Sequence, residues 1–216
     1  MKNNLLEVGK NARLSNVMRI LMVTPLYPPD IAGAAPYIKE LATRLKSDYS
    51  ITVLTYGHLP EQIPGVRIVS TSKRDHLFIR LFYFTRTLTR ELAHADVVFI
   101  ENGPSVELPS IFALCTCRKK VLMHVGDTRA LMGSIARARH RLILRLAWRK
   151  ATQVLIPEYV DPLSLQSVHT KKIQYIPDPE QRPEIHPLLD YPQARFDAYE
   201  LSWKAHLAVL TQFFKP

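Results

Sequence analysis

The sequence predicts an α/β fold with a single Rossmann-like, doubly wound parallel sheet and a C-terminal helix that packs back on it. Three observations predict this. Short β-rich segments alternate with helical ones, and several of these segments are continuous apolar runs, as in strands buried on both faces of a parallel sheet. A single amphipathic helix then follows a proline-rich stretch. The β-α-β alternation is typical of doubly wound sheets.

The predicted strands share an enrichment in branched apolar residues. They are Arg19–Thr24, Ile51–Tyr56, Val66–Ser70, Val97–Glu101, Val121–Val125, Gln153–Pro157 and Ile173–Ile176. Between the first two, apolar residues at positions 38, 41, 42 and 45 have helical spacing, and Pro36 stands near the start of this helix, where its missing N–H is harmless. Further helices fit residues 77–94, 105–117 and 134–150.

The 216 residues suit one α/β domain. We expect residues 1–17 to be an N-terminal extension, because Met18 begins a natural starting sequence. Residues 18–177 form the sheet domain. Residues 178–196 form a proline-rich linker, and residues 197–216 form the returning helix. In that helix Asp197 and Glu200 fit a capping box, and an apolar stripe comprises Tyr199, Trp203, Leu207, Leu210 and Phe214.

Composition narrows the class of protein. Apolar residues make up 47% and charged residues 22% of the chain, which is typical of a globular protein. No apolar run reaches the ~18 residues of a membrane span, and the N-terminus does not resemble a secretory signal. Cys115 and Cys117 lack the second cysteine pair of a zinc site, so we expect no metal and two reduced thiols. A cytoplasmic location is expected.

Three stretches together resemble the N-terminal, acceptor-side half of a family 4 glycosyltransferase of the GT-B fold. The first is "RILMVTPLYPPDIAGAAPYIKELATRL", where this family has paired prolines, a glycine loop and a helix. The second is "VLMHVGD", where it has a histidine at a strand end. The third is "ATQVLIPEYVDPLSLQS" with "KKIQYIPDP" at the domain junction. The resemblance covers about residues 18–180, and the terminal tryptophan-containing helix is similar to the helix that closes this fold.

The sequence differs from the family pattern in ways that affect the expected function. The donor-binding second domain and its paired glutamates eight positions apart are missing, and Ala34 replaces the second loop glycine. The resemblance therefore implies the half of a nucleotide-sugar-dependent hexosyltransferase that binds a glycan or lipid-linked acceptor. It implies no tightly bound cofactor. A UDP- or GDP-sugar would be the co-substrate, supplied through a separate donor-binding domain or subunit, and the chain alone would be inactive.

The resemblance and the strand ends together select the candidate residues. His124 and Asp127 are the candidate catalytic residues, since histidine suits hydroxyl chemistry near neutral pH. Gly33 and Ala34, before a helix N-terminus, would face the donor phosphates. Glu101 and Asn102 would bind acceptor hydroxyls. For each of them a structural role is the alternative: a capped core histidine, a helix cap for Asp127, a tight turn that needs one glycine at Gly33, or a polar turn.

The net charge of +10 is concentrated in one stretch. Residues 134–150 carry six positive charges and no negative one, and four arginines spaced four apart predict a basic ridge on one helix: Arg137, Arg141, Arg145 and Arg149. Phe78 and Phe82 fall outside the apolar stripe of residues 77–94. These features predict peripheral attachment to the inner face of an anionic membrane. A non-catalytic scaffold that keeps acceptor or membrane binding is the alternative function. A nucleic-acid-binding α/β protein is the weakest, because no stacking platform accompanies the arginines.

Overall fold

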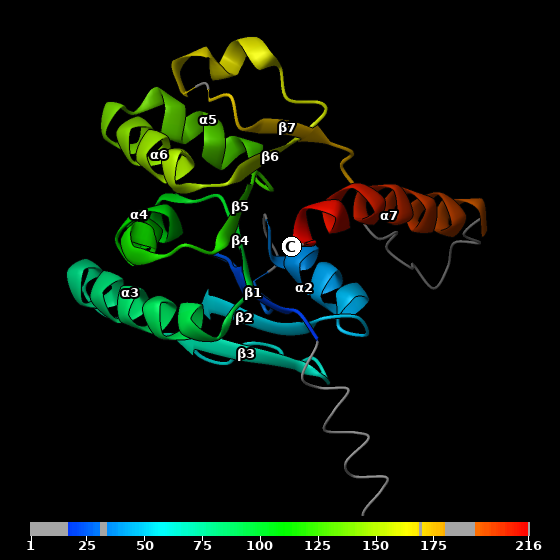
Figure 1. Cartoon of the computed structure of the whole chain (residues 1–216), viewed down its shortest axis with the longest axis horizontal. Helices are drawn as coiled ribbons and strands as arrows, with labels where there is room; N and C mark the ends of the chain where they lie inside the picture. Colours follow the sequence, from blue (N-terminus) through cyan, green and yellow to red (C-terminus); the bar gives the residue numbers. More distant parts are fainter. Residues whose placement is uncertain (1–16, 31–33, 169, 180–192, 216) are drawn as a thin grey trace, which may run out of the picture.

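The computed structural model describes residues 17–30, 34–168, 170–179 and 193–215. In this part of the chain, seven parallel strands form one sheet in the order β3-β2-β1-β4-β5-β6-β7 (Figure 1). The strands are β1 (Arg19–Val23), β2 (Ser50–Tyr56), β3 (Val66–Thr71), β4 (Val97–Glu101), β5 (Lys120–His124), β6 (Gln153–Pro157) and β7 (Ile173–Ile176). The predicted fold class is confirmed, and each predicted strand agrees with the observed one to within one residue at either end.

Helices cover both faces of the sheet. One face carries α3 (Leu77–His94), α4 (Pro104–Ala113), α5 (Thr128–Ala136) and α6 (Ala138–Lys150). The other carries α2 (Ala34–Leu45) and α7 (Gln193–Phe214), as Figure 1 shows. Two short 3₁₀ helices, η1 (Leu114–Thr116) and η2 (Pro162–Val168), lie before β5 and β7. The arrangement has three layers, with the sheet in the middle.

The strand residues divide between two cores with a period of two. Along β1, Leu21 and Val23 pack in the core beneath α3 to α6, whereas Ile20 and Met22 pack in the core beneath α2 and α7. Successive side chains on a strand point to opposite faces, so a strand between two helical layers must be apolar at every position. This is why the strands appear in the sequence as unbroken apolar runs.

The terminal helix α7 packs on the sheet, as predicted. Trp203, Leu210 and Phe214 are buried in the same core as α2. Arg44 of α2 holds the helix further, because its guanidinium donates two hydrogen bonds of 2.8 and 2.7 Å to the Glu200 carboxylate. That guanidinium also lies 5.1 Å from the ring centre of Trp203. The helix begins at Gln193 rather than 197, and Glu200 binds Arg44 instead of closing a capping box.

The predicted helix over residues 134–150 is wrong as a single helix. Arg137 is extended, with φ −98° and ψ 116°, and separates α5 from α6. The break has a packing reason. Leu131 of α5 and Leu144 of α6 are both buried in the same core, but on one continuous helix they would face about 140° apart at ~100° per residue. Only the interruption lets both helices bury their apolar sides.

Two predicted segments fall largely outside the described residues: the N-terminal extension, of which only Val17 is described, and the linker from residue 180 to 192. No helix in the described ranges has the length and apolar character needed to cross a membrane.

Candidate functional site

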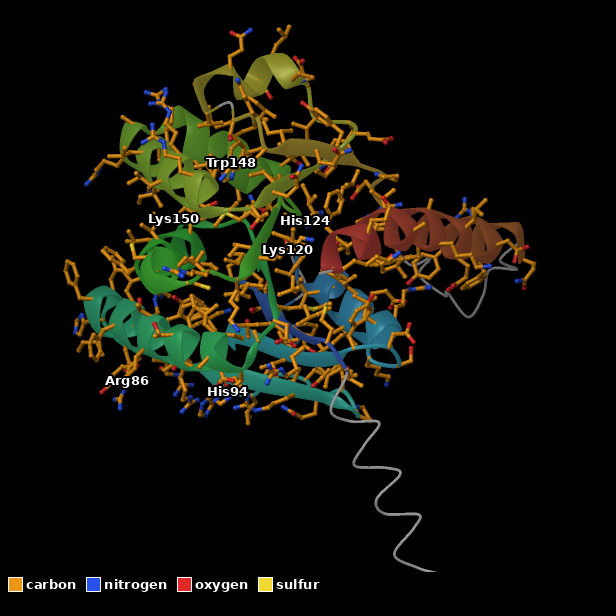
Figure 2. The ribbon with its side chains drawn as sticks, viewed as in Figure 1. Arg86, His94, Lys120, His124, Trp148 and Lys150 are labelled. Atoms are coloured by element: carbon orange, nitrogen blue, oxygen red, sulfur yellow. The ribbon has the colours of Figure 1, made fainter. Side chains whose placement is uncertain are left out.

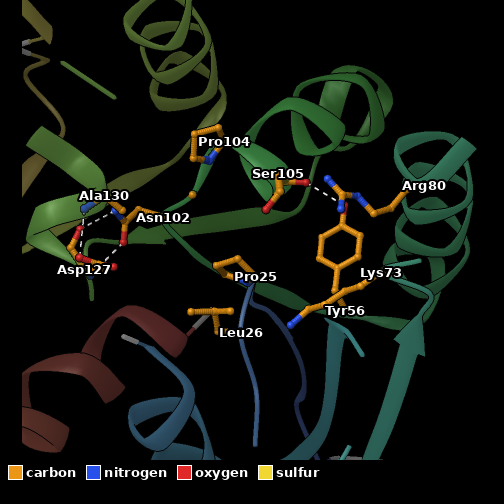
Figure 3. Close-up of a pocket in the computed structure, with 11 residues that line it drawn as sticks. Pro25, Leu26, Tyr56, Lys73, Arg80, Asn102, Pro104, Ser105, Asp127 and Ala130 are labelled. Carbon is orange, nitrogen blue, oxygen red and sulfur yellow. Dashed lines mark hydrogen bonds between the residues drawn. The ribbon is translucent and has the colours of Figure 1, made fainter. Parts of the chain in front are cut away.

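A cavity of about 330 Å³ opens at the carboxyl edge of the sheet (Figure 3). Pro25 and Leu26 follow β1, Asn102 and Gly103 follow β4, and Asp127 follows β5; all five line the cavity. The chain leaves β1 toward β2 on one side, while β4 pairs with β1 on the other. Ligands of open α/β sheets bind outside the strand ends at such a switch in strand order. The volume is at the small end of the ~300–1,000 Å³ of ligand sites.

Asn102 and Asp127 lie together at one end of this cavity. The Asn102 amide donates to the Asp127 carbonyl at 2.9 Å, and the Asp127 N–H donates to Asn102 Oδ1 at 3.1 Å. Asp127 also caps α5, where its Oδ1 accepts from the Ala130 N–H at 3.0 Å. Its Oδ2 accepts no hydrogen bond from the described residues. One carboxylate oxygen therefore fixes the side chain, and the other is left to accept a bond from a ligand hydroxyl.

Gly103 lets the chain turn tightly between β4 and α4. Its φ is +153°, and a Cβ there would lie 3.1 Å from Pro25 Cγ, so a larger residue would be strained and crowded. The Gly103 N–H donates to Glu107 at 3.2 Å. Burial raises the pKa of Glu107 to about 7, although the hydrogen bond from Gly103 acts in the opposite direction. The turn brings the first residues of α4 to the wall of the cavity.

Two cations and a tyrosine line the opposite end of the cavity, away from Asp127 (Figure 3). Lys73 comes from the loop after β3 and pairs with Asp30. Arg80 comes from the first turn of α3, and its guanidinium carbon lies 5.6 Å from the ring centre of Tyr56. The Tyr56 hydroxyl donates to the Ser105 carbonyl at 2.8 Å, and burial raises the tyrosine's pKa. The cavity thus has a carboxylate end and a cationic end.

His124 and Glu101 form a buried pair, and His124 lies on the α2 and α7 side of the sheet (Figure 2). They face each other as register partners on β5 and β4, and His124 Nδ1 lies 2.7 Å from Glu101 Oε1. Their exposed fractions are 1% and 0%. His124 Nε2 and Glu101 Oε2 are buried without a hydrogen-bonding partner among the described residues. Gly126 lies against the same carboxylate, and a Cβ there would overlap Glu101 Oε2.

Aromatic rings from two helices, α2 and α7, enclose this pair. Tyr37 of α2 stacks on His124 with ring centres 4.7 Å apart, and Trp203 of α7 stacks on the other side of Tyr37 at 5.7 Å. His206 Nδ1 donates to the Pro177 carbonyl at 2.7 Å, so its Nε2 is the acceptor of the Tyr37 hydroxyl at 2.8 Å. Burial lowers the pKa of His206 to about 4, against the Pro177 bond, which raises it. His124 is thus buried among aromatic rings, with the Glu101 carboxylate as its hydrogen-bonding partner.

The predicted site residues therefore separate into groups. Asn102 and Asp127 meet at the cavity, as expected from neighbouring strand ends. Glu101 and His124 meet each other but face the interior, where an acceptor contact would require α7 to move; their assigned roles stay predictions. Gly33 lies outside the described residues, and Ala34 is described only as the first residue of α2.

The predicted basic ridge is shorter than expected. Arg137 lies in the break between α5 and α6, so three of the four arginines keep helical spacing: Arg141, Arg145 and Arg149. Arg145 is partly engaged, because its Nε donates to the Ser167 carbonyl at 2.6 Å. Phe78 and Phe82 are exposed by 84% and 64% on α3, in agreement with their place outside the apolar stripe. The attachment itself stays a prediction.

Sequence reasoning missed Lys73, Arg80 and Tyr56. Lys73 lies between a strand and a helix, in the run "KRDH", which offers a weak signal for a loop at the carboxyl edge. Arg80 lies within a predicted amphipathic helix, where a charged residue indicates a solvated face. Only the crossing of α3 over the end of β2 brings its guanidinium to Tyr56.

Metal ligands are not gathered anywhere in the described ranges: no three histidine, cysteine or acidic side chains there lie close enough to share an ion. Cys115 and Cys117 are free thiols.

No family model matches the sequence, and no curated protein matches it. The chain is similar to crystal structures of Anabaena Alr3699/HepE in complex with UDP and with UDP-glucose, at 12% and 11% identity and TM-scores of 0.49 and 0.48. Each match covers 74% of this chain and 43% of the other, so the chain spans less than half the length of that protein.

Proposed function

We propose that this chain is the acceptor-binding half of a nucleotide-sugar-dependent glycosyltransferase and that the acceptor occupies the cavity at the carboxyl edge of the sheet. One observation carries the proposal: Asp127 presents an unengaged carboxylate oxygen into a cavity that is the size of a monosaccharide site, beside the amide of Asn102. A carboxylate there accepts hydrogen bonds from sugar hydroxyls and can take the proton from the attacking one. The motifs around β1, β5 and β7 support the same class of protein.

The donor side of the reaction is absent from these residues. A UDP- or GDP-sugar would be held by a separate domain or subunit facing this edge, since most contacts to a nucleotide in a GT-B enzyme come from the second domain. We therefore expect the chain alone to catalyse no transfer. Multiple turnover of UDP-glucose or GDP-mannose by the isolated chain would contradict this part of the proposal.

The acceptor site can be tested by saturation-transfer NMR of the full chain with a panel of neutral methyl glycosides. We expect at least one glycoside to bind and the signal to be lost in Asp127→Asn, which keeps the helix cap but removes the charge. Asp161→Asn is the matched control, because Asp161 also accepts from a backbone N–H two residues on, at 2.9 Å, but lies outside the cavity. Equal binding in both variants would contradict the assignment.

We also propose that the α3, α4 and α6 layer attaches the protein to an anionic membrane. Exposed apolar side chains stand on all three helices: Phe78 and Phe82 on α3, Phe112 on α4 and Leu142 on α6. Residues 128–150 carry seven positive charges and no negative one. Insertion of aromatic rings and attraction to anionic lipids combine in such surfaces, and each arginine near the lipid contributes ~1 kcal/mol.

Vesicle co-sedimentation tests this attachment. Wild type should bind anionic vesicles and ignore neutral ones. Release is expected for the triple change of Arg141, Arg145 and Arg149 to glutamine, and for the double change of Phe78 and Phe82 to serine. Leu201→Ser is the control, since Leu201 is 68% exposed on α7, on the other face of the sheet. Retention of RNA with no vesicle binding would instead favour a nucleic-acid partner.

A further inference from the structure

Arg80 faces the cavity, and no anion in the described part of the chain balances its charge. Among the described residues no carboxylate pairs with its guanidinium, and its Nε is buried without a hydrogen-bonding partner. The side chain is held in place by the ring of Tyr56, whose hydroxyl is fixed in turn by Ser105. A buried donor without a partner carries a desolvation cost that an incoming acceptor would remove. The guanidinium is therefore oriented in advance for an oxyanion.

Lys73 supplies a second cation at the same end of the cavity. Its partner Asp30 leaves the pair exposed, with the lysine side chain 39% and the aspartate side chain 38% accessible. Exposed pairs of this kind are weak, so a ligand anion can compete for the ammonium at little cost. The carboxylate of Asp127 lies at the opposite end, next to Asn102 and Ala130 (Figure 3). The cavity therefore separates a hydroxyl-accepting end from an oxyanion-accepting end.

We propose that the ligand of this cavity carries a phosphate that binds Arg80 and Lys73, while its sugar hydroxyls face Asp127. Two cations that line one end of the cavity match the two charges of a phosphate monoester, and the guanidinium fork fits two of its oxygens. The volume of about 330 Å³ suits one phosphorylated monosaccharide. The inference rests on the proposed function, because it names the acceptor class: a phosphorylated sugar, either soluble or as the head group of a lipid.

Isothermal titration of the full chain tests the inference with four probes: inorganic phosphate, a panel of sugar 1-phosphates, the matching neutral methyl glycosides, and dihexanoyl phosphatidate. Arg80→Gln should weaken phosphate and sugar-phosphate binding at least tenfold. Arg86→Gln is the matched control: it makes the same charge change on the same helix, but Arg86 is exposed and away from the cavity (Figure 2), so binding should stay within twofold. Asp30→Asn frees Lys73 and should strengthen binding several-fold.

The variants also separate charge from geometry. Arg80→Lys keeps the positive charge but loses the fork, so binding should fall at least threefold. This variant decides the question if Arg80→Gln fails to fold by circular dichroism. Preference for the sugar phosphates over phosphatidate assigns the site to a soluble acceptor, and the reverse preference assigns it to a lipid head group. Equal affinities in Arg80→Gln and Arg86→Gln would overturn the inference.

The outcomes distinguish this inference from the proposed function. If neutral glycosides bind as tightly as their phosphates and depend on Asp127 but not on Arg80, the phosphate site is overturned and acceptor binding stands. If inorganic phosphate binds through Arg80 but no sugar adds affinity through Asp127, the anion site stands and acceptor binding fails. Absence of binding by all four probes overturns both.

Discussion

At the carboxyl ends of β4 and β5, two pairs of polar residues that are close in sequence lie in contrasting environments. Glu101 and His124 turn inward, pair with each other and lie beneath α2 and α7, where they are almost wholly buried. Asn102 and Asp127 follow them by one and three residues and line an open cavity, where the Asn102 side chain bonds the backbone N–H and carbonyl of Asp127. The alternation of side chains along a strand accounts for the difference. A polar residue at a strand end is a candidate site residue only if the layer facing it is open.

The largest expected effect comes from removing the layer that covers the interior pair. Truncation after Asp190 deletes α7 and exposes the core that Trp203, Leu210 and Phe214 cover. Aromatic side chains of this kind contribute ~3–5 kcal/mol each when buried, so the loss approaches the whole stability of a domain. Aggregation is expected in size-exclusion chromatography. A soluble, equally stable truncation would refute the role of α7.

Substitution of His124 should destabilise the fold more than substitution of Asp127. His124→Ala leaves the Glu101 carboxylate buried without its partner, which costs ~3–5 kcal/mol. Asp127→Ala removes a helix cap and costs ~1 kcal/mol. Urea unfolding measures both free energies. Glycoside binding should show the reverse order, with Asp127→Ala losing the ligand and folded His124→Ala keeping it. Equal destabilisation by the two substitutions would contradict the claim that His124 has the larger structural role.

Two buried groups on opposite faces of the sheet, His206 and Glu107, are expected to change the stability of the protein with pH in opposite directions. Neutral His206, with its pKa lowered to about 4 by burial, makes the protein lose stability as pH falls from 6.5 toward 4, because the unfolded chain binds the proton first. Glu107, with its pKa raised to about 7 by burial, makes it lose stability as pH rises from 4.5 toward 7. Each effect is on the order of 2–3 kcal/mol, so they partly cancel.

Single substitutions separate these two contributions. In urea unfolding between pH 4.5 and 6.5, Glu107→Gln should gain stability with rising pH relative to wild type. His206→Gln should lose stability with rising pH on the same comparison. The other titrating groups are common to all three proteins, so their contribution drops out of the difference. Parallel pH profiles in the two variants would show that neither group has the altered pKa.

The smallest expected effects come from two glycines seven positions apart. Gly126→Ala places a methyl group against the Glu101 carboxylate, which is fixed by His124, and should cost ~1–3 kcal/mol. Gly133→Ala, inside α5, meets no atom within 4 Å and should stabilise by ~0.5–1 kcal/mol through its better helix propensity. Thermal unfolding measures both. A neutral Gly126→Ala would show that the interior pair has room to relax.

The local residue pattern of the sequence was enough to predict the strands and the fold class. A strand that is buried on both faces, such as β4 or β6, is apolar at nearly every position. This pattern can be recognised from the residues of the strand alone. The sequence also determined that α7 packs on the domain, since its stripe has one apolar side to bury. That Asn102 lies near the same edge as Asp127 followed as well, because the carboxyl ends of neighbouring parallel strands meet at one edge; the direct contact between them appeared only in the structure.

The elements that cover each strand end could not be predicted from the sequence. His124 is enclosed by Tyr37 and His206, which are 87 and 82 residues away along the chain, and no local pattern encodes such contacts. The break at Arg137 likewise follows from two helices that pack their apolar sides into one core. Arg80 reaches the cavity because α3 crosses the end of β2. Burial of a polar group depends on which distant element covers it, and that is settled only when the layers assemble.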